Sequence, residues 1–178
     1  MDAISPAQLQ QYVQSEFPGF FAAPIEIGDI VFEQRNALLC FYCSRYNNKW
    51  TCPPRTPKCD YASVFREYDH ALLVGHTEPI GKNYEISRYD SSVQLHRVLL
   101  SLENYLLENG NYVRISFIGG SCKLCKNGCA PDKCRNPYLA RIPLESTGVN
   151  VVKTAGKAGI SVRFPVKDAI TRIGLLLW

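Results

Sequence analysis

The eight cysteines of this 178-residue chain fall into two compact groups, and none is left over. The first quartet consists of Cys40, Cys43, Cys52 and Cys59, and the second quartet consists of Cys122, Cys125, Cys129 and Cys134. Four thiolates are the ligand set of a four-cysteine zinc site and also of a 4Fe-4S cluster. The spacing therefore predicts two metal sites, with all eight cysteines as cofactor-binding and metal-binding residues.

The second quartet is compact, with the spacing Cys-x2-Cys-x3-Cys-x4-Cys between residues 122 and 134. A short looping segment can reach all four irons of a cubane, whereas structural zinc more often takes two ligand pairs separated by a longer stretch. Gly119, Gly120 and Gly128 would let backbone amides approach the sulfur atoms. These features favour a 4Fe-4S cluster, with Zn²⁺ as the alternative.

The first quartet is looser, with the spacing Cys-x2-Cys-x8-Cys-x6-Cys, and its loop contains Tyr46 and Trp50. These aromatic side chains could shield a cluster from water or simply pack in the core. We again expect a 4Fe-4S cluster, although zinc is a stronger alternative here than at the second quartet. One cysteine of each run crosses over in two-cluster ferredoxins. Cys59 and Cys134 are the candidates for such an exchange between the quartets.

The formal net charge of +4 suggests an anionic partner at first sight. Two sites of four thiolates each would contribute about −2 apiece and bring this charge to about zero. Basic residues are interleaved with both quartets: Lys123, Lys126, Lys133 and Arg135 with the second, and Arg55 and Lys58 with the first. We interpret them as partners of anionic clusters, ahead of a solvated surface, and we do not expect nucleic acid as a partner.

Nothing in the sequence indicates export or a membrane. Residues 1–18 mix polar and charged residues among apolar ones, unlike a signal peptide, and no apolar run is long enough to cross a bilayer. We therefore expect a cytoplasmic protein whose thiols stay reduced, with no membrane partner. The even cysteine count leaves disulfide pairing as an alternative.

The remaining chain predicts an α/β protein of one domain, residues 1–178, with a mixed sheet, covering helices and two cysteine-ligated metal loops; an α+β mixed sheet is the alternative. We expect helices at 5–16, 61–68, 91–108 and 143–155, and strands at 25–32, 37–42, 70–75, 112–118, 160–165 and 172–177. Strand, helix and strand between residues 70 and 118 predict a parallel crossover. The second quartet then begins at the carboxyl end of a strand, where ligands collect in such sheets.

Other candidate chemistry is sparse. His70, His76 and His96 have structural or surface positions in the predicted elements, and no phosphate-binding or dinucleotide-binding glycine motif is present. Glu103 is expected to be a solvated helix charge, and Glu145 to make a helix-end interaction near Arg141. No catalytic residue is assigned, and the sequence does not decide whether the protein is an enzyme.

Both cysteine motifs resemble those of a known family. The motif Cys-x2-Cys-x2-Tyr-x3-Trp-x-Cys-Pro-Pro begins at Cys40, and the second quartet is followed by Arg135 and Pro137. This pattern, over residues 25–178, is similar to the predicted metal-binding proteins of a prokaryotic domain of unknown function. The resemblance implies metal binding, through iron–sulfur clusters, with all eight cysteines as ligands, and it implies no particular reaction.

Four cysteines per cluster would leave no iron open to substrate, which favours electron transfer with a redox partner protein. A two-cluster ferredoxin needs much less chain, so we expect the remaining residues to form a docking surface or a pocket. The alternatives are a zinc-binding structural or interaction module with two four-cysteine sites, and a small-molecule reductase that uses the clusters. The oligomeric state does not follow from the sequence.

Overall fold

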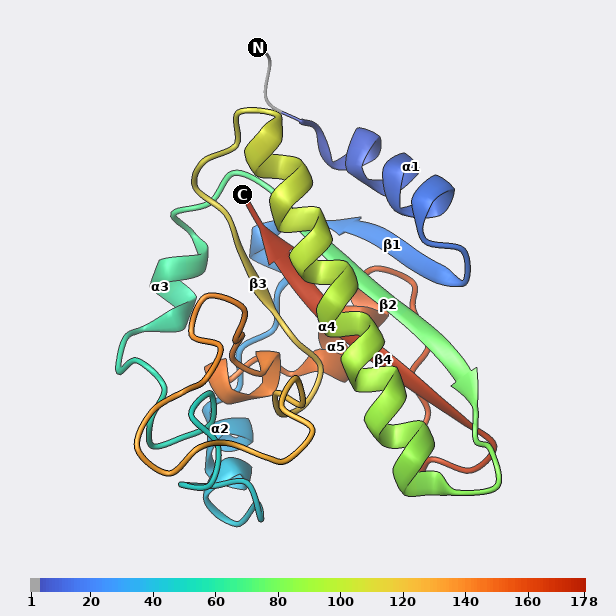
Figure 1. The fold of residues 1–178 in the computed structure, drawn as a ribbon. Helices are drawn as coiled ribbons and strands as arrows, with labels where there is room; N and C mark the ends of the chain where they lie inside the picture. Colours follow the sequence, from blue (N-terminus) through green and yellow to red (C-terminus); the bar gives the residue numbers. More distant parts are fainter. Residues whose placement is uncertain (1–3) are drawn as a thin grey trace.

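One four-stranded sheet organises the computed structural model, which describes residues 4–178 (Figure 1). Its strands are β1 (Phe20–Ile25), β2 (Ala71–Pro79), β3 (Ile115–Phe117) and β4 (Ala169–Leu177), in the order β1-β2-β4-β3. All three neighbouring pairs are antiparallel. β2 and β3 therefore run in the same direction, as the predicted crossover requires, and β4 lies between them.

Helices cover both faces of this sheet. α1 (Pro6–Glu16) and α4 (Tyr84–Glu108) pack on one face, where Leu9 and Leu99 join a core with Leu72, Val74 and Leu176. The other face packs against α3 (Tyr61–Phe65), α5 (Val151–Lys157) and the 3-10 helix η2 (Leu144–Thr147). The predicted single domain of sheet and covering helices is confirmed, and its antiparallel pairing corresponds to the α+β form of the prediction.

The strand sequences explain why both faces are covered. Residues 71–76 of β2 are all buried, and alternate side chains enter opposite core clusters: Leu72 and Val74 one, Ala71 and Leu73 the other. Gly174 of β4 permits the close approach of α4, because a methyl group at this position would lie 2.6 Å from Leu99 Cδ1. The sheet is thus a rigid middle layer between two sets of helices.

Two helix predictions differ in outcome. The predicted N-terminal helix is confirmed, and Ser5 and Gln8 form a reciprocal capping box at its start. The long helix begins at Tyr84 instead of residue 91, because the Asn83 side chain accepts hydrogen bonds from the amides of Glu85 and Ile86. The extra turns bring Tyr89 of α4 against the loop of the second quartet.

Three predicted strands are absent from the described residues. β1 ends at Ile25 and is followed by the 3-10 turn η1 (Ile27–Asp29), and residues 160–165 form no strand. The segment 37–42 belongs mostly to the helix α2 (Gln34–Phe41). Its apolar run suggested a buried strand, but Leu38 and Phe41 are exposed. Apolar composition here does not reflect burial in the sheet.

Both cysteine-bearing loops lie at one end of the molecule, beside α2 (Figure 1). Residues 42–60 and 119–142 contain no helix or strand, apart from turns. The prediction that the second quartet follows the carboxyl end of a strand is confirmed, since β3 ends at Phe117. Across residues 4–178, no helix is both long enough and apolar enough to cross a membrane.

Candidate metal centre

The second quartet comes together around one small cavity. Cys122, Cys125, Cys129 and Cys134 all line it and are all partly buried. Cys134 therefore lies with its own quartet and not with the first one. The structure supports the predicted grouping of these four cysteines.

The ends of the second-quartet loop are tied to each other. The Ile118 amide donates to the Ile142 carbonyl at 3.1 Å, and the Leu144 amide donates to the Ile118 carbonyl at 2.9 Å. The loop therefore leaves and re-enters the core at a single point beside β3. Its cysteines are held in a closed Ω-like excursion, a form that is common at functional sites.

Contacts with α4 hold the same loop from the side. The Tyr89 hydroxyl donates to the Lys123 carbonyl at 2.9 Å, and His96 Nε2 lies 2.9 Å from the Leu139 carbonyl. Burial lowers the pKa of His96 to about 4, so its imidazole is neutral at physiological pH and acts as a structural donor. The interpretation of the histidines as structural is supported for His96, and for His76, whose Nε2 lies 2.8 Å from the Ser91 carbonyl.

Glu103 provides a further anchor, and its prediction as a solvated charge is wrong. This carboxylate, in α4, is 6% exposed. It accepts hydrogen bonds from the Ser116 amide at 2.9 Å and from Arg141 Nε at 2.7 Å. Burial alone would raise the pKa of Glu103, but the hydrogen bonds from Arg141 and Ser116 outweigh it and the pKa is lowered. The ion pair thus fixes the end of the loop to α4.

The hydrogen bonds to sulfur come from different groups than the sequence suggested. Gly120 and Gly128 have positive φ angles, but their amides donate to oxygen atoms, those of Glu145 and Cys125 respectively. Instead, Asn136 Nδ2 donates to Cys125 Sγ at 3.2 Å. A donor to a ligating thiolate stabilises its negative charge and adjusts the potential of a bound cluster.

Two residues of the first-quartet loop also face the second cavity. Trp50 and Thr51 line it, and Trp50 Nε1 donates to the Ala130 carbonyl at 2.8 Å. Thr51 is 7% exposed, and its hydroxyl has no hydrogen-bond partner among the described residues. The Thr51 side chain acts on the neighbouring Cys52 thiol and offsets part of the rise in its pKa, so a thiolate at Cys52 or a cluster sulfide would supply the missing acceptor. The residues present therefore fit a bound sulfur-containing group.

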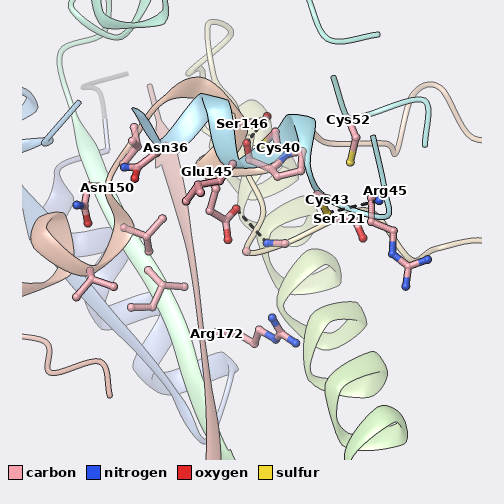
Figure 2. A pocket seen from close by; sticks show the side chains of 18 of the residues that line it. Asn36, Cys40, Cys43, Arg45, Cys52, Ser121, Glu145, Ser146, Asn150 and Arg172 are labelled. Atoms are coloured by element: carbon pink, nitrogen blue, oxygen red, sulfur yellow. Dashed lines mark hydrogen bonds between the residues drawn. The ribbon is translucent and has the colours of Figure 1, made fainter. Parts of the chain in front are cut away.

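The first quartet is arranged differently. Cys40, Cys43 and Cys52 line a second, larger pocket of about 530 Å³, whereas Cys59 does not (Figure 2). Cys59 is exposed and lies beside Tyr61; burial raises the pKa of Tyr61 to about 12, and the Cys59 thiol adds to this effect. The structure brings three members of the quartet together and does not test whether Cys59 binds metal.

Specific contacts place Cys40 at this pocket. The Glu33 amide donates to the Gly148 carbonyl at 2.8 Å, and its carboxylate accepts from Asn150 Nδ2 and Lys153 Nζ. These bonds dock the start of α2 against η2 and α5. Cys40, near the end of α2, therefore faces Glu145 of η2 across the pocket (Figure 2).

Glu145 and Lys123 both line this larger pocket. The sequence had predicted Glu145 near Arg141 and Lys123 beside the second quartet. Glu145 was expected near Arg141, but its Oε2 accepts from the Gly120 amide at 3.2 Å, while Arg141 pairs with Glu103. Lys123 Nζ donates to Ser92 Oγ at 2.9 Å, and burial lowers the pKa of Lys123 to about 8. The other basic residues interleaved with the quartets, Lys58, Lys126, Lys133, Arg135 and Arg55, are exposed. Lys58, Lys126, Lys133 and Arg135 fit the solvated-surface interpretation, whereas Arg55 lies over the Trp50 ring and Lys123 lines the pocket.

The electrostatics of the thiols argue against reactive cysteines. Burial raises the pKa of Cys52 to about 12 and also raises those of Cys40 and Cys122. Nucleophilic and redox-active cysteines instead have lowered pKa values. All eight cysteines are free in the structure, so the disulfide alternative finds no support. Cys40, Cys52 and Cys122 would have to release their protons to bind a metal, so metal affinity is expected to depend on pH.

No three His, Cys, Asp or Glu side chains of residues 4–178 converge closely enough to hold a single metal ion. Four thiolates on one Zn²⁺ have sulfur atoms about 3.8 Å apart, as tetrahedral geometry with a Zn–S bond of about 2.3 Å requires. A cubane accepts a wider set, because each thiolate binds a different iron. Either group would use the four cysteines that line the second cavity.

Comparison with protein families agrees with the chemistry of these residues. The family model described as "Predicted metal-binding protein (DUF2284)" matches residues 23–178, which is most of the chain. The chain belongs to this family. As a member of DUF2284 it is assigned to a metal-binding family, and the description names neither the metal nor a reaction. No curated protein and no solved structure matched the chain.

Proposed function

We propose that this DUF2284 protein is a cytoplasmic iron–sulfur protein that binds two 4Fe-4S clusters and exchanges electrons with a redox partner protein. The observation that supports this proposal most strongly is the cavity lined by all four cysteines of the second quartet. These four residues would hold one cluster. When bound, such clusters supply one-electron redox chemistry.

The surroundings of the second quartet suit an anionic sulfur-containing group. Trp50 and Thr51 line the cavity, and Asn136 donates to Cys125. The compact sequence spacing of the four cysteines favours iron–sulfur over zinc at this site.

At the first quartet we propose that Cys40, Cys43 and Cys52 hold the second cluster. Cys59 is exposed and lines neither cavity, so we do not assign it to this cluster. With three cysteine ligands, one iron would remain without a cysteine on the side of the pocket. This differs from the full ligation that the sequence suggested.

The two sites are neighbours, which supports electron transfer between them. Thr51 lines the second-quartet cavity and the next residue, Cys52, lines the larger pocket. Burial is the main cause of the raised pKa of Cys52, but Cys122 of the other quartet also contributes. Charges that influence each other in this way lie a short distance apart. An electron accepted at one site would therefore have a short path to the other.

Anaerobic purification tests the proposal. We expect a brown protein with a broad visible absorption that bleaches on reduction, containing about eight iron and eight sulfide ions per chain, the content of two 4Fe-4S clusters. A colourless protein with about two zinc ions and no sulfide would overturn it in favour of the zinc-binding module.

A further inference from the structure

The larger pocket has two unlike halves. Arg172, Lys123 and Glu145 line its polar part, and Val151, Val162 and Phe164 are among the apolar side chains of the rest. Its volume of about 530 Å³ lies within the range of about 300–1,000 Å³ that is typical of small-molecule sites. A pocket of this size is larger than a cluster ligand shell requires.

Arg172 has an unused donor in the polar half. Its Nε donates to Ser91 Oγ at 3.2 Å and one terminal nitrogen donates to the Arg88 carbonyl at 3.1 Å. The other terminal nitrogen, Nη1, has no hydrogen bond within the part of the chain that the structure describes. The existing bonds fix the guanidinium plane, so the free donor has a set direction.

Arg172 and Lys123 converge on one place beside Gly120. A methyl group at Gly120 would lie 3.6 Å from Arg172 Nη1 and 3.9 Å from Lys123 Nζ. Neither cation forms an ion pair with a carboxylate of residues 4–178. Glu145 faces the same space from the opposite wall but makes its hydrogen bond with the Gly120 amide (Figure 2).

The charge of Glu145 acts on both Lys123 and Arg172. Besides Arg88, which pairs with Glu85, the lining contains Arg45, Lys123 and Arg172 against this one carboxylate. A bound anion would compensate the remaining positive charge. Arginine is well suited to carboxylates, because two of its N–H groups can bind the two oxygens. The valine and phenylalanine side chains would cover a hydrocarbon tail. We propose that this pocket is a binding site for a small organic carboxylate, with its carboxylate group at Arg172 and Lys123 and its tail along Val162 and Phe164.

This inference goes beyond the proposed electron-transfer function and holds for either metal. It places the carboxylate beside Cys40, Cys43 and Cys52, which line the same pocket. An alternative role for the cations is to balance the charge of thiolates bound to metal. In that case the pocket would bind no carboxylate.

Titration calorimetry on the anaerobically purified full-length protein tests the inference with acetate, butyrate and hexanoate. Each added methylene is expected to tighten binding about fourfold, because burial of one CH2 group contributes about 0.8 kcal/mol to the free energy of binding. Hexan-1-ol and hexylamine, which lack the carboxylate, are expected to bind at least about tenfold more weakly than hexanoate. No binding by any carboxylate, or equal binding of hexanol and hexanoate, would overturn the inference.

Variants locate the site. Arg172→Gln is expected to weaken hexanoate binding about tenfold or more, while Arg97→Gln, which alters an exposed arginine of α4 outside the pocket, leaves it unchanged. Val162→Ser is expected to reduce the gain from butyrate to hexanoate without changing acetate binding. If Arg172→Gln fails to fold, hexanoate binding is measured instead with the Val162→Ser and Arg172→Lys variants. Unchanged binding in folded Arg172→Gln, or an unchanged chain-length gain in Val162→Ser, would contradict the assignment.

The same samples separate this inference from the proposed function. Iron, sulfide and zinc are measured in each protein before titration. Protein with iron and sulfide but no carboxylate binding would refute the inference alone. Protein with zinc and normal hexanoate binding would refute the iron–sulfur proposal alone.

Discussion

The two cysteine quartets occupy adjacent sites, but their surroundings differ. All four cysteines of the second quartet lie on one loop around a small cavity, and α4 holds this loop through Tyr89, His96 and Glu103. The first quartet places only three cysteines at a large pocket that also contains charged and apolar side chains. A closed thiol shell is suited to holding a redox group in place. An incomplete shell at an open pocket is suited to contact with a second molecule.

The strongest test of this comparison removes one cysteine from each site. Cys129→Ser and Cys43→Ser are each expected to lose about half of the iron and sulfide, because each variant disables one of two 4Fe-4S clusters. Inductively coupled plasma analysis and a sulfide assay provide the measurement. Loss of all iron from either variant would show that the two sites share ligands or fold together.

The anchoring of the second loop predicts a large loss of stability in Glu103→Ala. Its removal leaves Arg141, whose side chain is 18% exposed, without its partner. We expect the free energy of unfolding to fall by about 3 kcal/mol, as is typical when one member of a buried ion pair is removed. Glu108→Ala, in the same helix but exposed, is the matched control and should change it little.

The Glu103–Arg141 ion pair also makes the free energy of unfolding depend on pH. The pKa of Glu103 is lowered in the folded protein, so its contribution to stability is complete above the ordinary glutamate pKa of about 4.3 and is lost as the pH falls through the folded value. Denaturant unfolding between neutral and acid pH should therefore show a smaller decline in Glu103→Ala than in the wild type. An identical decline in both proteins would contradict this assignment.

A smaller effect is expected from the hydrogen bond to sulfur in the second site. The Asn136 side chain donates a hydrogen bond to Cys125 Sγ, and this bond stabilises the more negative, reduced state of a cluster. Asn136→Leu removes it. We expect the potential of one cluster to become more negative by about 20–60 mV, which corresponds to a hydrogen bond of about 0.5–1.5 kcal/mol. Redox titration followed by electron paramagnetic resonance measures the shift. A shift of both clusters, or a positive shift, would be inconsistent with a local contact.

The smallest effect is predicted for Cys59→Ser. Cys59 is exposed and lines neither cavity, so iron and sulfide contents should equal those of the wild type. Cys52→Ser, at the same loop but with a buried thiol, is the matched control and should lose one cluster. A loss of one cluster in Cys59→Ser would restore the full ligation of the first quartet.

Short-range patterns predicted much of this arrangement. The capped helix at residues 6–16, the strand after residue 70 and the grouping of the second quartet follow from local spacing and apolar periodicity. The insertion of β4 between β2 and β3 could not be predicted in this way, because it depends on pairing between segments about a hundred residues apart.

The details of the site were harder to predict for the same reason. Trp50 lies within the first motif in sequence but covers the second cavity, and Lys123 lies within the second motif but faces the larger pocket. In the sequence, Glu103 resembles an exposed helix residue, and only the folded structure places Ser116 and Arg141 against it. The unequal environments of the quartets thus arise from tertiary contacts that the cysteine spacing does not contain.

Mössbauer spectroscopy of iron-isotope-enriched wild-type protein tests the central claim most directly, because it reports each iron environment separately. We predict signals of two 4Fe-4S clusters in which about one iron in eight differs from the rest, as follows from the proposal that only three cysteines hold the first cluster. A spectrum in which all irons are bound alike by sulfur would contradict the difference between the sites. Absence of iron from protein purified without oxygen would contradict the iron–sulfur proposal itself.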